Sequence, residues 1–178
     1  MTTFKIDKML YKLRVFLETD GDDVYRDIEI QDDASLEDLH NVIVNSFDFD
    51  GNEMAAFYLT DDELNQGMEI PLFNMDESQP VHNLMSNTLL KDVLSQETPN
   101  LLYVYDFLSM WRFLVNLMDT GEEAPGIEYP LVAHAQGIRP EDPPEIDFNA
   151  MPDDEPDIFD GDDNPFGEYF GYDENEWN

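Results

Sequence analysis

The densest apolar and aromatic run in the chain extends from Leu101 to Met118, and its side chains alternate between two directions. Alternation with a period of two in aromatic and β-branched residues predicts two strands. We expect Leu108–Met110 to form a three-residue loop between them. The residues that share a face are Tyr103, Tyr105 and Phe107 in the first strand, and Trp111, Phe113, Val115 and Leu117 in the second.

This loop fixes the register of the predicted hairpin. It places opposite one another Phe107 and Trp111, Tyr105 and Phe113, and Asp106 and Arg112. Aromatic cross-strand pairs each stabilise a sheet by roughly 0.2–1 kcal/mol. We therefore predict an aromatic ladder on one face and an ion pair between Asp106 and Arg112 on the other. The aromatic set is core in one interpretation, and part of an exposed peptide-binding groove in another.

The residues before this hairpin predict a first hairpin followed by a helix. Met9–Glu18 and Val24–Ile30 are the expected strands, because an Asp- and Gly-rich turn separates them. Ser35 is a good helix N-cap, and Asp38 completes an approximate capping box. Apolar residues then recur at helical spacing as far as Phe47. The segment from Ser35 to Phe47 is therefore an expected amphipathic helix.

Shorter elements are expected in the rest of the chain. Ala55–Thr60 and Met68–Phe73 are the next strands, and Thr88–Leu94 is a short helix. Glu128–Ala135 is either a last edge strand or an irregular segment, since Pro130 would interrupt a central ladder. The predicted fold class is α+β. It has a mixed, mostly antiparallel sheet of about six strands, one main helix packed across it in a β-grasp-like start, and a short second helix.

Charge changes this picture most. The 178 residues include 42 acidic and 8 basic side chains, for a net charge of −34, and no cysteine. Because DNA binding depends on Lys and Arg displacing counterions from phosphates, direct nucleic-acid binding is disfavoured. Disulfides and thiolate chemistry are excluded. No stretch approaches the roughly 18 apolar residues of a membrane span, so we expect a soluble, cytoplasmic protein with no membrane partner.

The composition divides the chain at Arg139. We assign residues 1–139 to an α+β domain and residues 140–178 to an acidic tail that contains prolines and aromatic residues. The tail holds 15 acidic and no basic residues, which predicts a flexible segment. Its aromatic residues favour ordering on a partner, and a purely solubilising tail is the alternative. The tail could also fold back onto a basic patch around Lys12, Arg14 and Arg26.

The hairpin carries a resemblance to a known family. Tyr105-Asp106-Phe107, a short turn and then Trp111-Arg112 resemble the signature hairpin of the Ri-plasmid ORF-3-like family. Other matching stretches are Ser35-Leu36-x-x-Leu39-His40-x-x-Ile43 with Phe47, and Tyr129-Pro130. The family usually has Gly-Asp where Leu108 and Ser109 stand. The resemblance covers about residues 9–144. Some members are labelled resolvase-like or transposon passengers, and the family implies no settled activity.

Candidate chemistry is sparse. His40 projects onto the apolar side of the main helix, where a hydrogen-bonded core role is more common than a functional one. The three histidines have no paired metal-ligand spacing. Asp48-x-Asp50-x-Asn52 begins like a calcium loop, but a glycine and a bidentate glutamate are missing from the required positions. We predict no catalytic, cofactor-binding or metal-binding residue and no cofactor. The structural or interaction candidates are Tyr105, Asp106, Phe107, Trp111, Arg112 and His40.

Three functions remain open from the sequence. The leading hypothesis is a non-enzymatic protein-interaction module whose partner is another protein, associated with mobile elements by family resemblance alone. The second is an acidic DNA mimic that binds a basic nucleic-acid-binding protein, since a strong field would steer that encounter. The third, a resolvase-like enzyme or nuclease, is the least favoured because no nucleophile motif is present.

Overall fold

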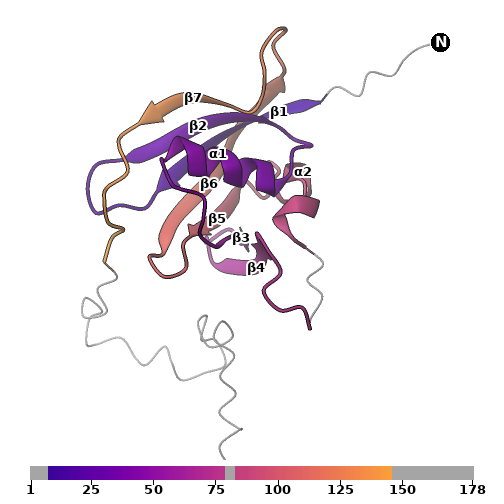
Figure 1. Cartoon of the computed structure of the whole chain (residues 1–178). Coiled ribbons are helices and arrows are strands. Elements are labelled where there is room, and N and C mark those ends of the chain that lie inside the picture. Colours follow the sequence, from indigo (N-terminus) through magenta and orange to yellow (C-terminus); the bar gives the residue numbers. More distant parts are fainter. Residues whose placement is uncertain (1–7, 79–82, 146–178) are drawn as a thin grey trace, which may run out of the picture. The chain divides into compact units, whose positions relative to one another are not determined.

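The computed structural model describes residues 8–78 and 83–145 (Figure 1). The chain divides into two units, Met1–Pro144 and Glu145–Asn178. The second unit, apart from Glu145, lies outside the described residues, and so does most of the predicted acidic tail. No helix among the described residues is long and apolar enough to cross a membrane.

One sheet of seven strands organises the described chain, in the order β4-β3-β5-β6-β1-β2-β7. Every neighbouring pair in it is antiparallel, so the parallel pairing of a mixed sheet does not occur among the described strands. The strands are β1 Met9–Leu17, β2 Val24–Gln31, β3 Ala55–Thr60, β4 Gln66–Pro71, β5 Asn100–Tyr105, β6 Trp111–Glu122 and β7 Leu131–Gln136.

The α+β class is confirmed, but the sheet has seven strands where about six were predicted. The additional strand is β7, which comes from the segment that the sequence left open between edge strand and irregular chain. Pro130 precedes the first residue of β7, so it removes no hydrogen bond from the ladder with β2. The sheet can therefore extend by one strand at that edge.

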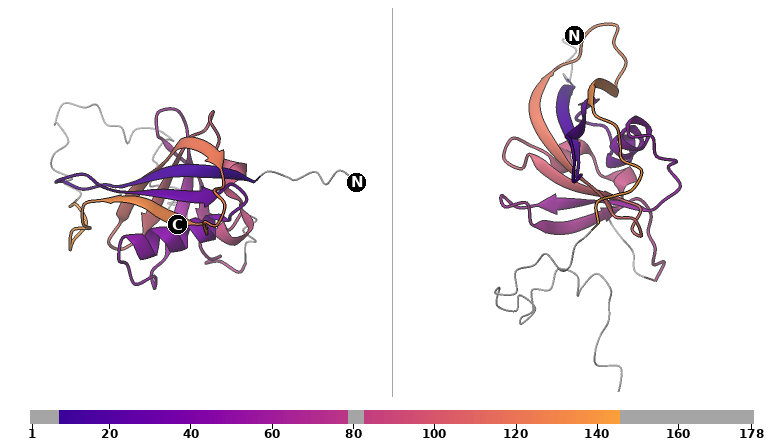
Figure 2. Two further views of the ribbon diagram at one scale, coloured as in Figure 1. Left: turned by 90° about the horizontal axis from the view of Figure 1, so that it is seen from above. Right: turned by 90° about the vertical axis from the view of Figure 1, so that its left-hand side faces the viewer.

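The main helix, α1, runs from Leu36 to Ser46 and begins at the predicted cap. The Ser35 side chain accepts a hydrogen bond from the Asp38 N–H, and the Asp38 carboxylate accepts one from the Ser35 N–H. In both views of Figure 2, α1 lies to one side of the sheet. Two short helices, η1 (Met85–Asn87) and α2 (Leu90–Val93), contribute Met85 and Leu90 to the same core as α1.

The main hydrophobic core lies on the α1 side of the sheet, which we call the core face. Alternate residues of each strand point there, as the buried positions of β1 and β2 show. Helix and strand residues form one cluster, which includes Leu13, Val15, Ile28, Leu36, Leu39, Ile43, Phe47, Phe57, Tyr103 and Phe113. The opposite side, which we call the open face, carries the intervening residues.

Two arginines close the C-terminus of α1, whose last turn contains no basic residue. The Arg26 Nε donates to the Ser46 carbonyl oxygen at 2.9 Å. The Arg139 Nε donates to the Phe47 carbonyl oxygen at 2.9 Å, and its Nη2 donates to that of Asp48 at 3.1 Å. Positive charge at this end also opposes the helix dipole. The start of β2 and the segment after β7 are thereby fastened to the helix.

This placement corrects the predicted basic patch around Lys12, Arg14 and Arg26. Arg26 is 7% exposed and faces the core, whereas Lys12 and Arg14 occupy the half-buried alternate positions of β1, on the open face. Arg14 is paired with Asp27 at 2.7 Å. The three basic side chains therefore do not form one surface on which an acidic segment could dock.

The register of the central hairpin also differs from the prediction. Tyr105 lies opposite Trp111, and Val104, not Asp106, lies opposite Arg112. The loop spans Asp106 to Met110 because both of these residues adopt positive φ angles of 59°. The Met110 N–H donates to the Asp106 carbonyl oxygen at 2.6 Å and closes the turn. Because the loop is longer than predicted, every cross-strand pair between β5 and β6 differs from the predicted pair.

The predicted Asp106–Arg112 ion pair is consequently wrong. The Asp106 carboxylate accepts hydrogen bonds from the Leu108 and Ser109 N–H groups at 3.1 and 3.3 Å, inside its own loop. Arg112 instead pairs with Glu18, the residue that follows β1, and its Nε lies 3.5 Å from the Glu18 carboxylate.

Candidate functional site

The six candidate residues fall into separate environments. Tyr105 and Trp111 are buried on the core face, His40 is buried in α1, and Asp106 organises the hairpin loop. Phe107 and Arg112 lie toward the open face, where Phe107 packs against the cluster of Ala56, Tyr58 and Val104. The structure therefore does not bring the six together into one site.

Tyr105 and Trp111 meet at Phe49, which follows α1. The Phe49 ring centroid lies 4.5 Å from that of Tyr105 and 5.4 Å from that of Trp111. The Arg139 guanidinium lies 4.5 Å from the Phe49 ring centroid and 5.2 Å from that of Trp111. Rings and cation together fasten the segment after α1 to the hairpin.

The Tyr105 hydroxyl completes this junction. It donates to Asp50 Oδ1 at 2.8 Å and accepts from the Gly51 N–H at 3.0 Å. Burial, and then the Asp50 carboxylate, raise the pKa of Tyr105 to about 12. Hydrogen bonds from the Asn52 backbone and from Tyr105 lower the pKa of Asp50. The tyrosine is thus a neutral structural donor and the aspartate a charged acceptor, which is a bracing arrangement and not an acid–base pair.

The exposed aromatic groove is ruled out by burial. Tyr103, Tyr105, Trp111 and Phe113 are 0%, 2%, 5% and 2% exposed. The core interpretation of these residues holds, and a peptide-binding role for this set is wrong.

His40 has the surroundings of a core residue. It is 4% exposed, and its Nδ1 lies 2.7 Å from the Tyr103 hydroxyl oxygen. Burial lowers the pKa of His40 to about 4 and raises the pKa of Tyr103 well above its usual value. Both side chains are therefore neutral near pH 7, and their hydrogen bond joins α1 to β5.

A surface with binding character lies on the open face, where apolar side chains stand in cross-strand register. Phe16 lies opposite Leu114, and Leu114 lies opposite Leu102. We call these three residues the apolar row. Tyr25 continues it on the Phe16 side, with ring centroids 5.3 Å apart, and Tyr58 continues it on the Leu102 side. All three members of the row are half-buried.

A polar row runs beside the apolar row. Arg14 makes a bidentate contact with Asp27, at 2.7 and 2.9 Å. The Asn116 Nδ2 donates to Asn100 Oδ1 at 2.7 Å. These groups satisfy one another in two pairs, one across β2 and β1 and one across β6 and β5.

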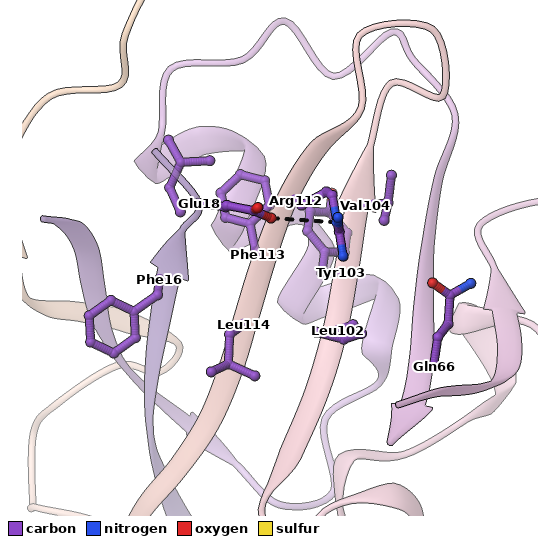
Figure 3. A pocket seen from close by; sticks show the side chains of 10 residues that line it. Phe16, Glu18, Gln66, Leu102, Tyr103, Val104, Arg112, Phe113 and Leu114 are labelled. Atoms are coloured by element: carbon purple, nitrogen blue, oxygen red, sulfur yellow. Dashed lines mark ion pairs between the residues drawn. The ribbon is translucent and has the colours of Figure 1, made fainter. Parts of the chain in front are cut away.

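On the other side of the apolar row the face is hollowed (Figure 3). The hollow has a volume of about 200 Å³ and is lined by Phe16, Glu18, Gln66, Leu102, Val104, Arg112 and Leu114, with backbone from the adjoining positions. The Glu18–Arg112 ion pair forms its rim, with side chains 59% and 47% exposed. An apolar floor with a polar rim is the usual anatomy of a small contact surface.

The lining limits the chemistry of this hollow. Its charged side chains, Glu18 and Arg112, neutralise each other, and no Ser, Thr or His lines it. Tyr103 lines it too, but the Tyr103 hydroxyl is hydrogen-bonded to His40 in the core. Within residues 8–78 and 83–145 no group of three or more His, Asp or Glu side chains is arranged to hold a metal ion. The geometry is suited to holding an apolar side chain and offers no converging acid and base.

Of the predicted candidates only Arg112 lines the hollow, and sequence reasoning missed the apolar row. A signal was present in the sequence. β5, NLLYVY, is apolar at consecutive positions where a half-solvated strand would alternate, and Leu114 breaks the alternation of β6 in the same way. Apolar residues on both faces of β5 and β6 indicate a second surface to cover.

Comparisons with known proteins bear on family and fold. A family model, plasmid pRiA4b ORF-3-like protein, matches residues 9–147. The solved structure of a protein of unknown function from Methanosarcina mazei Go1 is similar, with a TM-score of 0.62 and 21% sequence identity. That similarity covers 72% of this chain and 70% of the other, and it concerns the fold. The comparison with curated proteins found no match.

Proposed function

The chain belongs to the plasmid pRiA4b ORF-3-like family, and we propose that it acts as a non-enzymatic protein-interaction module. Its proposed contact surface is the apolar row with the adjoining hollow. The supporting observation is that Phe16, Leu102 and Leu114 stand half-buried in register on the face opposite the described helices. Contiguous apolar patches on a surface commonly mark interaction sites.

The partner is a protein that brings an apolar side chain to the hollow. Direct nucleic-acid binding is a poor fit, because a net charge of −34 repels phosphates. The Glu18–Arg112 pair supplies one group of each sign at the rim, so a polar contact around the apolar anchor needs no strongly charged partner. Association of this role with mobile elements rests on the family alone.

Affinity capture from a native lysate tests this proposal, with the full-length chain as bait. Leu114→Glu places a charge in the apolar row, whereas Leu108→Glu makes the same change in the hairpin loop, where Leu108 is 95% exposed. We expect a set of proteins retained by the wild type and by Leu108→Glu, and lost by about tenfold or more with Leu114→Glu. Thermal unfolding of both variants controls for folding.

Salt concentration separates the proposal from its main competitor. Capture through an apolar anchor should persist at high salt, whereas a DNA mimic would hold basic proteins through charge and lose them as salt rises. Equal capture by the wild type and Leu114→Glu would remove the apolar row from the proposal. Magnesium-dependent DNA cleavage by the purified chain would instead revive the enzyme hypothesis.

A further inference from the structure

β7 leaves one edge of the sheet unpaired by any described strand. It pairs with β2 on one side and ends the strand order on the other. Its sequence, LVAHAQ, contains no Asp, Glu, Lys or Arg, although the chain carries 50 such residues as 42 acidic and 8 basic side chains. Natural proteins usually protect edge strands with charged side chains or proline. β4, at the other edge, contains both Glu69 and Pro71.

The free side of β7 adjoins a groove. α1 lies alongside β7 (Figure 2), and the hollow between them has a volume of about 520 Å³. The groove is lined by Asp38, Asn41, Val42, Asn45 and Ser46 from α1, by Leu131 and Val132 from β7, and by Pro130 before β7. Val132 is 42% exposed. A helix beside an open strand edge offers backbone hydrogen bonds on one wall and side-chain contacts on the other.

We infer that the groove between β7 and α1 binds an extended, basic segment of a partner protein, which adds to the sheet as a further strand. The backbone of β7 would supply the hydrogen bonds. Val42, Leu131 and Val132 provide apolar contact for alternate side chains of the segment. This surface is distinct from the apolar row, so the inference does not depend on the proposed function.

The negative charge of the groove and of the whole chain favours a basic partner segment. Asp38 is the charged residue of the groove lining, and no cation lines it. The surrounding field is that of a chain with net charge −34, which attracts Lys- and Arg-bearing segments. The same charge opposes pairing of β7 with a second copy of this chain, because two such molecules repel each other. In a segment with alternating apolar and basic residues, the apolar side chains would enter the groove and the basic ones would lie on the open face, where β2 carries Asp27 and Glu29.

A synthetic octapeptide of alternating valine and lysine is the probe, titrated into the full-length chain. We expect saturable binding, no binding of the valine–glutamate counterpart, and slower amide exchange within β7 on binding. N-methylation of alternate backbone amides removes the donors on one edge of the peptide only. One of the two methylation patterns should therefore weaken binding by about tenfold or more, and the other should change it little.

Two protein variants with the same charge change complete the test. Val132→Lys puts a cation in the groove, and Leu108→Lys puts one in the hairpin loop, where Leu108 is 95% exposed. We expect about a tenfold loss with Val132→Lys and less than about a twofold change with Leu108→Lys. The methylated peptides keep the test valid if Val132→Lys unfolds the chain.

Several results would overturn the inference. Equal binding of both methylated peptides would show that no strand is added. Equal losses with the two lysine variants would show attraction by net charge alone. Failure of the octapeptide to bind, with β7 amides already protected from exchange, would mean that the chain covers this edge itself. A dimer that dissociates with Val132→Lys would assign the edge to a second copy.

Discussion

The two faces of the sheet differ in how completely their side chains are covered. On the core face the residues of β5 and β6 are almost fully buried, and their polar groups have partners such as His40 for Tyr103. Among the described residues no buried side-chain nitrogen or oxygen atom is left without a hydrogen bond. On the open face the same two strands present Leu102 and Leu114 half-buried.

The contrast is instructive because it follows single strands. β2 reads VYRDIEIQ, and its open-face residues include Tyr25 and Asp27, of which Asp27 pairs with Arg14 of β1. Leu114 and Leu102 of β6 and β5 stand in line with Tyr25, whereas Asn116 and Asn100 of the same strands stand in line with Asp27. The open face therefore changes from apolar to polar along each strand. The apolar row is suited to a contact with a partner, and the polar row is already paired within the sheet.

The largest expected loss of stability comes from Phe113 of β6, and its neighbour Leu114 serves as the comparison on the other face. Phe113→Ala should lower the free energy of unfolding by about 3–5 kcal/mol, because it opens a cavity in the core. Leu114→Ala, on the open face, should cost about 1 kcal/mol, since a half-buried leucine gains only part of its transfer energy. Urea denaturation of both variants provides the measurement. Similar losses would mean that the two faces are equally packed.

Arg139 tests how the core face is closed. Arg139→Ala should cost about 2–3 kcal/mol, because it leaves the Phe47 and Asp48 carbonyls without their charged donor. Arg139→Lys keeps the charge but cannot donate in a fork or stack equally well on Phe49. We expect an intermediate loss for the lysine variant in the same urea assay. Full stability with lysine would reduce the role of Arg139 to charge alone.

His40 makes the stability of the core face depend on pH. Its pKa is about 4 in the folded chain, below the ordinary value of 6.5, so the unfolded chain binds the proton more readily. The contribution is complete above about pH 6.5 and is lost as pH falls toward 4. Between pH 7 and pH 5 the loss should be about 2 kcal/mol.

Comparison with His40→Gln isolates this contribution. Glutamine can keep a hydrogen bond to Tyr103 but does not titrate, while relief of the general negative charge affects both proteins alike. The difference in unfolding free energy between wild type and variant should therefore change with pH in the stated direction. A constant difference from pH 7 to pH 5 would show that His40 is protonated as easily in the folded as in the unfolded chain.

Local pattern predicted much of the core face. The capping box of Ser35 and Asp38 predicted the start of α1, and the alternation of apolar and polar residues predicted the strands. The hairpin register was mispredicted because positive φ angles at Asp106 and Met110 lengthen the loop. Aspartate adopts such a conformation occasionally, but methionine gives no signal of it. Arg139 contacts a helix end that is 92 residues away in sequence, which no local pattern encodes.

The open face could be predicted only in part. The apolar character of both faces of β5 was visible, but the register that aligns Leu102, Leu114 and Phe16 joins three strands that are distant in sequence. Glu18 and Arg112 pair at the rim of the hollow beside them. The hairpin pattern had assigned Arg112 to Asp106, so the rim could not be anticipated without the correct register.

The smallest expected effects concern the two ion pairs of the open face, Glu18–Arg112 and Arg14–Asp27. In a double-mutant cycle, Glu18→Gln and Arg112→Gln should show a coupling energy of about 0.5 kcal/mol or less, because both side chains are exposed and solvent screens them. The bidentate contact of Arg14 with Asp27 is more covered, so its coupling should be larger than that of Glu18 with Arg112. The measurement is urea denaturation at low and at high salt. A weak Glu18–Arg112 pair lets the rim of the hollow open to a partner at little cost, whereas a coupling equal to that of the polar row would make the rim a fixed part of the fold.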